Sequence, residues 1–184
     1  MPPGVRPLPP ASAETNLSVF EPSGAKVHNG EARGTWPKGR LIRMLAELRQ
    51  HHEKIGNLLT ELEVLCEDHH ADIVKVSAVR IELTRASRAR SAYLHSVVYP
   101  KLMRTCPPDK RIALEKLKSD GVLMLVRSGD HIRRWTTREI TANWPGYCRA
   151  SAAARQTMRD RIALEAEIIY PLLKAEGPSD LPRT

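Results

Sequence analysis

Arginine and glutamate side chains near the end of the chain are spaced to form an ion pair. Arg161 and Glu165 are four residues apart, which is one helical turn, so they project from the same face. Arg90 holds the corresponding place in an earlier, similar segment, but Leu94 stands one turn after it. Arginine is costly to bury without a partner. Arg90 is therefore expected to reach Glu165, meet water, or bind an anionic ligand.

Further basic residues come from the same two segments, and the whole set is Arg85, Arg88, Arg90, Arg155, Arg159 and Arg161. Arginines gathered in this way suit phosphate or carboxylate groups, whereas a scattered set forms an ordinary solvated face. The formal net charge of +8 permits contact with nucleic acid or an acidic membrane without showing it, and an acidic protein or a small anion is a further possible partner. No Gly-rich phosphate loop and no known nucleic-acid-binding motif occurs, so nucleic acid is not indicated.

Histidines provide a second kind of candidate chemistry, because imidazole binds metals or hydrogen-bonds within a core. His52 falls on or next to an apolar helical stripe, four residues after Leu48 and three before Ile55. His69 and His70 fall in an expected turn, where a solvated loop is the simpler interpretation. The sequence thus selects His52 as an inward-facing histidine.

The cysteines indicate a reducing compartment. Cys66, Cys106 and Cys148 are far apart, their number is odd, and no signal-peptide core precedes them, so reduced thiols in the cytoplasm are expected. No set of nucleophile, base and orienting residue surrounds them, and the sequence does not predict an enzyme. No run of about 18 apolar residues suggests a membrane span.

A repeated helical segment organises the chain. Residues 161–171 form an amphipathic pattern ending in Tyr170-Pro171, and residues 90–100 repeat it with Tyr99-Pro100. Aligning the two endings superposes Arg90 on Arg161. Leu94 then matches Glu165, and His95 lies one position further on. The pattern indicates an internal duplication of a helical unit.

The apolar periodicity predicts an all-α fold, an antiparallel up-down-up-down four-helix bundle. The expected helices span residues 39–67, 72–103, 109–142 and 148–175, and the third is either one bent helix or two. Residues 1–38 hold seven of the 14 prolines and are expected to be a disordered tail. The bundle is expected over 39–176, and 177–184 form a C-terminal tail.

Over residues 41–175 the chain resembles the hemerythrin-like family, whose bundles carry a so-called HHE cation-binding domain. The segment Leu48–Ile55 is similar to the family's first helix, which brings a metal-binding histidine. The hydrophobic-Tyr-Pro endings at 97–100 and 168–171 are similar to those of its second and fourth helices. His131, in the segment 129–133, is similar to the histidine of its third helix.

The resemblance implies a non-haem di-iron centre with oxygen, iron or redox-stress roles. In that family, helices two and four each bring a His and, one turn later, a Glu. Here Arg90 and Arg161 stand at the His positions, and arginine offers no lone pair to a metal. The remaining donors, vestigial or weak, are His52, His131 and Glu165, with His95 a substitute one position along. The bundle has then lost its metal and acts in binding, sensing or regulation, or it keeps a single altered iron site.

Overall fold

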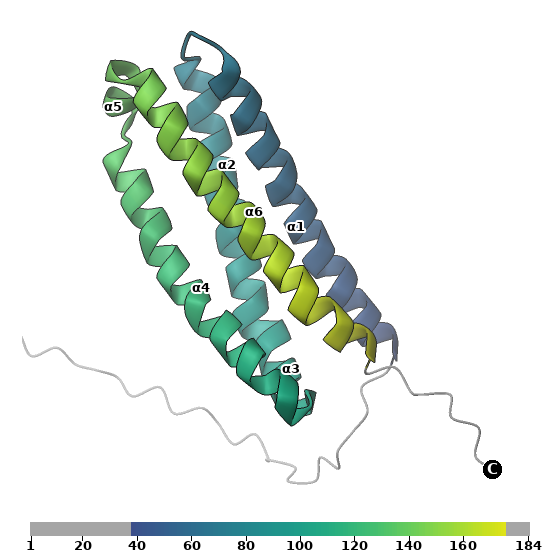
Figure 1. The fold of residues 1–184 in the computed structure, drawn as a ribbon. Coiled ribbons are helices and arrows are strands. Elements are labelled where there is room, and N and C mark those ends of the chain that lie inside the picture. Colours follow the sequence, from purple (N-terminus) through teal and green to yellow (C-terminus); the bar gives the residue numbers. More distant parts are fainter. Residues whose placement is uncertain (1–37, 176–184) are drawn as a thin grey trace, which may run out of the picture. The chain divides into compact units, whose positions relative to one another are not determined.

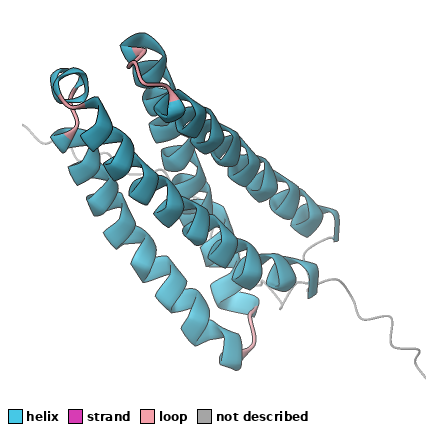
Figure 2. Ribbon diagram, turned by 45° about the horizontal axis from the view of Figure 1, so that its top comes forward, coloured by secondary structure: helices cyan, strands magenta, loops and turns pink. Residues whose placement is uncertain are grey.

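The computed structural model describes residues 38–175, which form helices joined by short turns (Figure 1). The elements are α1 (Lys38–Glu67), α2 (Ile73–Tyr93), the π-helical turn η1 (Leu94–Val98), α3 (Tyr99–Thr105), α4 (Pro108–Arg134), α5 (Thr137–Ala142) and α6 (Trp144–Ala175). No strand occurs within this range (Figure 2), which confirms the predicted all-α class. Of the expected tails, 1–38 and 177–184, only Lys38 is among the described residues.

The third predicted helical region is two helices. Gly121 and Gly129 both lie inside α4, although each glycine costs an exposed helix about 1 kcal/mol. The chain leaves the helix only at Trp135, and α5 then begins after Thr136, whose hydroxyl accepts a hydrogen bond from the Glu139 backbone N–H at 3.3 Å. This N-cap stabilises a separate start, so the break follows capping chemistry rather than the glycines.

The last helix begins earlier than the sequence predicts. The sequence predicts helices over 109–142 and 148–175 and leaves residues 143–147 between them, but α6 starts at Trp144. Pro145 lies in its first turn, where a missing backbone N–H has no intrahelical partner to lose. Asn143 precedes the helix, and its side-chain oxygen accepts from the Gly146 N–H at 3.0 Å. Asn143 and Pro145, two residue types that are common in loops, therefore stand at the start of this helix.

The core consists of apolar clusters at different levels along the helices. One joins α1, α3 and α6 and includes Leu48, Leu102 and Ile169, and another lies beside α5 and includes Val76 and Ile140. Each fully buried side chain of this size contributes roughly 1.5–3 kcal/mol. Polar and charged side chains from α1, α2 and α6 are also buried, and they form the candidate site.

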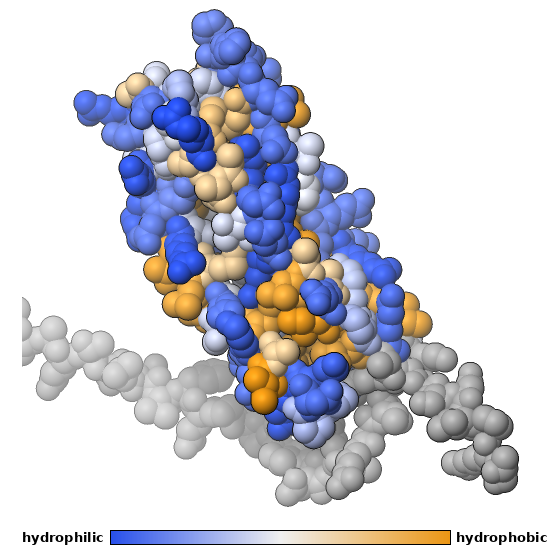
Figure 3. All heavy atoms as spheres, in the orientation of Figure 1, coloured by the Kyte–Doolittle hydropathy of each residue, from blue (hydrophilic) through white to orange (hydrophobic). Residues whose placement is uncertain are grey.

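Among the long helices, α4 exposes the most apolar side chains. Leu114 and Leu117 are buried, but Val122, Leu123 and Val126 are 53%, 60% and 58% exposed. Figure 3 shows apolar side chains at the surface on the face formed by α4 and α6. Among the helices between residues 38 and 175, none is long and apolar enough to cross a membrane.

The π-helical turn changes which residues face inward. The Tyr99 N–H donates to the Leu94 carbonyl, five residues back, so the turn holds one more residue than an α-helical turn. In a regular helix, residues nine apart point about 180° apart, but an inserted residue reduces this to about 80°. Arg90 and Tyr99 are both buried, which a regular helix would disfavour.

Candidate functional site

Glu165 is the centre of a buried polar network and is 0% exposed. Arg161, one turn earlier on α6, donates from Nε to Glu165 Oε1 at 2.6 Å. His52 Nε2, from α1, lies 3.0 Å from Oε2, and Arg90 Nη1, from α2, lies 3.4 Å from the same oxygen. One carboxylate is therefore shared by three side chains from three helices.

The Arg161 guanidinium is well hydrogen-bonded. Besides Glu165, it donates from Nη2 to the Leu117 carbonyl at 2.6 Å and to the Tyr99 hydroxyl at 3.3 Å. A Cβ atom at Gly121 would lie 3.0 Å from this Nη2. The absence of a side chain at Gly121 thus leaves the space in which Arg161 reaches α4.

His52 is held on both sides of its ring. Nε2 faces Glu165, and Nδ1 lies 2.8 Å from the Tyr170 hydroxyl. A proton on Nε2 satisfies both contacts, because Nε2 then donates to the carboxylate and Nδ1 accepts from the hydroxyl. Burial raises the pKa of Tyr170 and keeps it a donor, with Arg49 opposing and Glu165 adding to the shift.

Arg90 is the member of the network that lacks good partners. It is 5% exposed, and its contact with Glu165 is within ion-pair range but outside hydrogen-bond geometry. Its Nε and Nη1 have no hydrogen-bond partner within residues 38–175. Burial lowers the pKa of Arg90, and the charge of Arg161 lowers it further against the opposing effect of Glu165. Two guanidinium charges against one carboxylate leave one positive charge in excess.

The carboxylate remains the charged partner of this network. Burial alone would raise the pKa of Glu165, but the hydrogen bond from His52 and the charges of Arg90 and Arg161 outweigh burial and lower it. Burial also raises the pKa of Tyr99 to about 12. Neither group neutralises the excess charge near neutral pH, since Glu165 is already ionised and Tyr99 keeps its proton.

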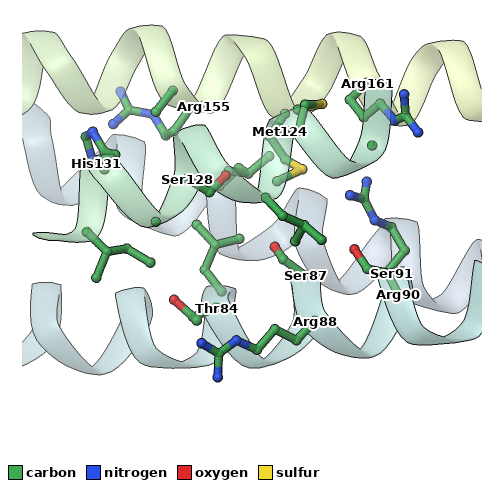
Figure 4. Close-up of a pocket in the computed structure, with 18 of the residues that line it drawn as sticks. Thr84, Ser87, Arg88, Arg90, Ser91, Met124, Ser128, His131, Arg155 and Arg161 are labelled. Atoms are coloured by element: carbon green, nitrogen blue, oxygen red, sulfur yellow. The ribbon is translucent and has the colours of Figure 1, made fainter. Parts of the chain in front are cut away.

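A cavity of about 190 Å³ adjoins the network, between α2, α4 and α6 (Figure 4). The charged residues that line it are Arg80, Arg88, Arg90, Arg155, Arg161 and Glu165. Five arginines and one glutamate give 5 − 1 = +4 with the histidines neutral. The hydroxyls of Ser87, Ser91 and Ser128 also line it, so the wall offers hydrogen-bond donors beside the positive charge.

His131 does not join the network. It lies at the opposite end of the cavity from Arg90 and Arg161, near Arg155 (Figure 4). On α4 the residue beside Arg161 is Gly121, ten residues earlier, which is about 15 Å along a helix. Burial and the charges of Arg80 and Arg134 lower the pKa of His131. The sequence pattern predicts that His131 lies on a helix, but it does not predict how far along the bundle axis this residue lies.

The other candidate metal donors lie in different parts of the structure. His95 is exposed, packs edge-on against the Tyr99 ring at 5.3 Å and lines the cavity. The structure therefore joins His52 and Glu165 directly and places His131 and His95 elsewhere. In the part of the chain that the structure describes, no three His, Cys, Asp or Glu side chains are grouped to hold a metal. Two donors beside two guanidinium groups do not fit a di-iron centre.

The resemblance to hemerythrin-like bundles placed Arg90 and Arg161 where that family has metal-binding histidines, and the structure places both beside Glu165. Sequence reasoning missed the hydrogen bond between Tyr170 and His52 and the hydrogen bond from Arg161 to the Leu117 carbonyl. It also missed the cavity. The two Tyr-Pro endings marked the tyrosines, but only as a repeat. No family model, no curated protein and no solved structure matches this chain.

Proposed function

We propose that the protein is a hemerythrin-like, up-down-up-down bundle in which the degenerate metal site serves to bind a small anion, as a cytoplasmic binding, sensing or regulatory protein. The observation that carries the proposal is Arg90, a buried guanidinium whose Nε and Nη1 have no hydrogen-bond partner among the described residues, on the wall of a positively charged cavity. An anion entering the cavity would accept hydrogen bonds from Arg90 and cancel the excess charge.

Energetics support this assignment. A buried ion without full compensation costs several kcal/mol, and Glu165 already serves Arg161 and His52. A network selected for stability alone would gain from an apolar residue in place of Arg90. Retaining the charge is useful if a ligand completes the pairing, because binding energy then offsets the burial cost.

The alternative of a non-haem iron protein with an oxygen, iron or redox-stress role has less support. His52 and Glu165 offer two donors, and the positive charges of Arg90 and Arg161 oppose a cation. The alternative of a module for an acidic or phosphorylated partner rests on exposed arginines such as Arg85 and Arg88. Arg85 is paired with Glu82 at 2.6 Å, which leaves it less available.

Thermal unfolding with and without anions tests the proposal. Phosphate, sulfate and acetate are added to the full chain at constant ionic strength, and the most effective one is expected to raise Tm by several degrees. A ligand at 100 times its Kd stabilises by about 2.7 kcal/mol, and 1 kcal/mol shifts Tm by roughly 2–4 °C for 150–250 residues. Arg90→Met is expected to remove this rise.

Arg85→Met is the matched control, because Arg85 is an exposed arginine on the same helix and should leave the response unchanged. An equal response in the Arg90 and Arg85 variants would contradict the proposal. So would two iron atoms per purified chain together with an oxo-bridge absorption band.

A further inference from the structure

A second buried arginine faces the same cavity from α6. Arg155 is 5% exposed, donates from Nη1 to Ser151 Oγ at 2.9 Å, and lines the cavity. Its Nε has no hydrogen-bond partner among residues 38–175. The Glu63 carboxylate lies 3.8 Å from Nη2 and is bound more closely by Arg159 at 2.6 Å. Arg155 therefore also has capacity for an acceptor.

The two under-partnered arginines lie at opposite ends of the cavity. In Figure 4, Arg90 and Arg161 are at one end, Arg155 and His131 are at the other, and Met124 lies between them. Arg155 and Arg161 are six residues apart on one helix, which corresponds to about 9 Å. Apolar side chains, including Leu83, Leu125 and Met158, also line the cavity, and Figure 4 places the hydroxyls of Ser87 and Ser128 between the two ends as well.

The pattern of charge fits a ligand with two acidic ends. A ligand with one acidic group would satisfy Arg90 and leave Arg155 Nε without an acceptor. It would also cancel one charge where the lining carries a net +4. A compact dianion such as phosphate would meet Arg90 and Arg161 but leave the space beside Met124, between the two ends, unfilled.

On the premise of the anion site proposed above, we infer that its ligand is a linear organic dianion with an apolar chain between its acidic groups, whose separation is on the scale of the axial rise of about 9 Å between Arg155 and Arg161. One acidic group accepts from Arg90, beside Arg161. The other accepts from Arg155 Nε, beside Ser151. The apolar chain lies along Met124 and Met158, where its burial contributes about 0.8 kcal/mol per methylene.

Calorimetric titration of the wild-type full chain with dicarboxylates of increasing length tests the spacing without any substitution. Succinate, adipate, suberate and sebacate are compared with octanoate, which has the carbon number of suberate and one carboxylate. Suberate is expected to bind tightest of the series and about tenfold or more tighter than octanoate, as one added charge-assisted hydrogen bond would give.

Substitutions then assign the two ends. Arg155→Met is expected to reduce suberate affinity about tenfold, to the level of octanoate, and to leave octanoate affinity unchanged. Arg90→Met is expected to weaken both. Arg159→Met, a neighbour on α6 that shares Glu63 but does not line the cavity, is the control and should change neither.

The outcomes separate the two proposals. If octanoate binds through Arg90 but no dicarboxylate binds tighter, the two-ended ligand is wrong and the anion site stands. The same conclusion follows if affinity shows no optimum with chain length. If no carboxylate or inorganic anion binds wild type better than Arg90→Met, both proposals fail.

Discussion

At the residue level, Glu165 stabilises the buried network because, among residues 38–175, it is the only one with a carboxylate on the cavity wall. Removing its charge would leave Arg161 and Arg90 buried without a counter-ion. We expect Glu165→Gln to lower the free energy of unfolding by about 3–5 kcal/mol, as when one partner of a buried ion pair is removed. Urea unfolding at neutral pH measures this change.

Glu167→Gln is the control, since Glu167 is exposed on the same helix and its substitution should change stability by less than about 0.5 kcal/mol. A loss below about 1 kcal/mol for Glu165→Gln would mean that the arginines do not depend on this carboxylate.

Arg90 should behave in the opposite way. Methionine removes a buried charge, two of whose nitrogens lack hydrogen-bond partners among residues 38–175, while Glu165 retains Arg161 and His52. Without added anion, Arg90→Met is therefore expected to have a Tm equal to or above that of the wild-type chain. Differential scanning calorimetry in dilute buffer measures it. If this variant were as unstable as Glu165→Gln, Arg90 would be a structural counter-charge rather than a ligand-binding residue.

His131 should make stability depend on pH. Its folded pKa lies below the unfolded value of about 6.5, chiefly because burial disfavours its charged form. The unfolded chain thus binds more protons just below pH 6.5, and stability rises with pH through that range and levels off above it. Glu165 acts at lower pH, because its folded pKa is below the ordinary carboxyl range.

His131→Gln is expected to flatten the rise in Tm between pH 5 and pH 7, measured by thermal unfolding at several pH values. Burial also lowers the pKa of His51, so His51→Gln should flatten it as well, and the double variant should flatten it most. An unchanged curve in the double variant would show that neither histidine controls this transition.

At the level of elements, α4 approaches the buried network at Gly121, where the helix has no side chain. At Gly121 a Cβ would crowd the Arg161 guanidinium at 3.0 Å, whereas at Gly129 the nearest atom is Arg133 Nη1 at 3.4 Å. Alanine is favoured over glycine in a helix by up to about 1 kcal/mol. Gly129→Ala should therefore stabilise by roughly 0.5–1 kcal/mol.

Gly121→Ala should gain less than Gly129→Ala, since Arg161 must shift from the Leu117 carbonyl. Gly121→Leu should be clearly destabilising because a larger side chain displaces the guanidinium. Urea unfolding of the three variants measures the differences. Equal gains from the two alanine variants would argue against close contact between α4 and Arg161.

On the scale of the whole molecule, the long helices differ in how firmly they are packed. Helix α1 buries Leu48, Ile55 and Leu59 almost completely, whereas the middle of α4 exposes Val122, Leu123 and Val126. Few buried apolar contacts allow local opening at lower free energy. Amides in the middle of α4 are expected to exchange with solvent faster than those in the middle of α1, as hydrogen-exchange mass spectrometry measures.

An anion that binds the cavity should slow exchange in α4, because α4 forms one wall. The prediction would be contradicted if anion binding slowed the exchange of α1 amides alone. Equal exchange of the two helices in the free protein would also contradict it.

The sequence by itself determined the features that depend on local geometry. Helical periodicity predicts the all-α class, and four-residue spacing predicts the Arg161–Glu165 pair, because both follow from the angle between successive residues. The repeat also aligns Arg90 with Arg161 and so predicts that both face the interior, since duplicated helices tend to present equivalent positions to it, but it left open whether Arg90 meets Glu165, water or an anion. His52 could be selected for a similar reason, from its place on an apolar stripe.

Only the tertiary structure decided what depends on register between helices. His131 lies at the other end of the cavity because axial level is set by the turns and packing around α4, which periodicity does not encode. The π-helical turn at Leu94–Val98 likewise changes the inward face without a local signal. In the described part of the chain, some nitrogens of Arg90 and Arg155 lack hydrogen-bond partners, because three helices surround a space that their side chains do not fill.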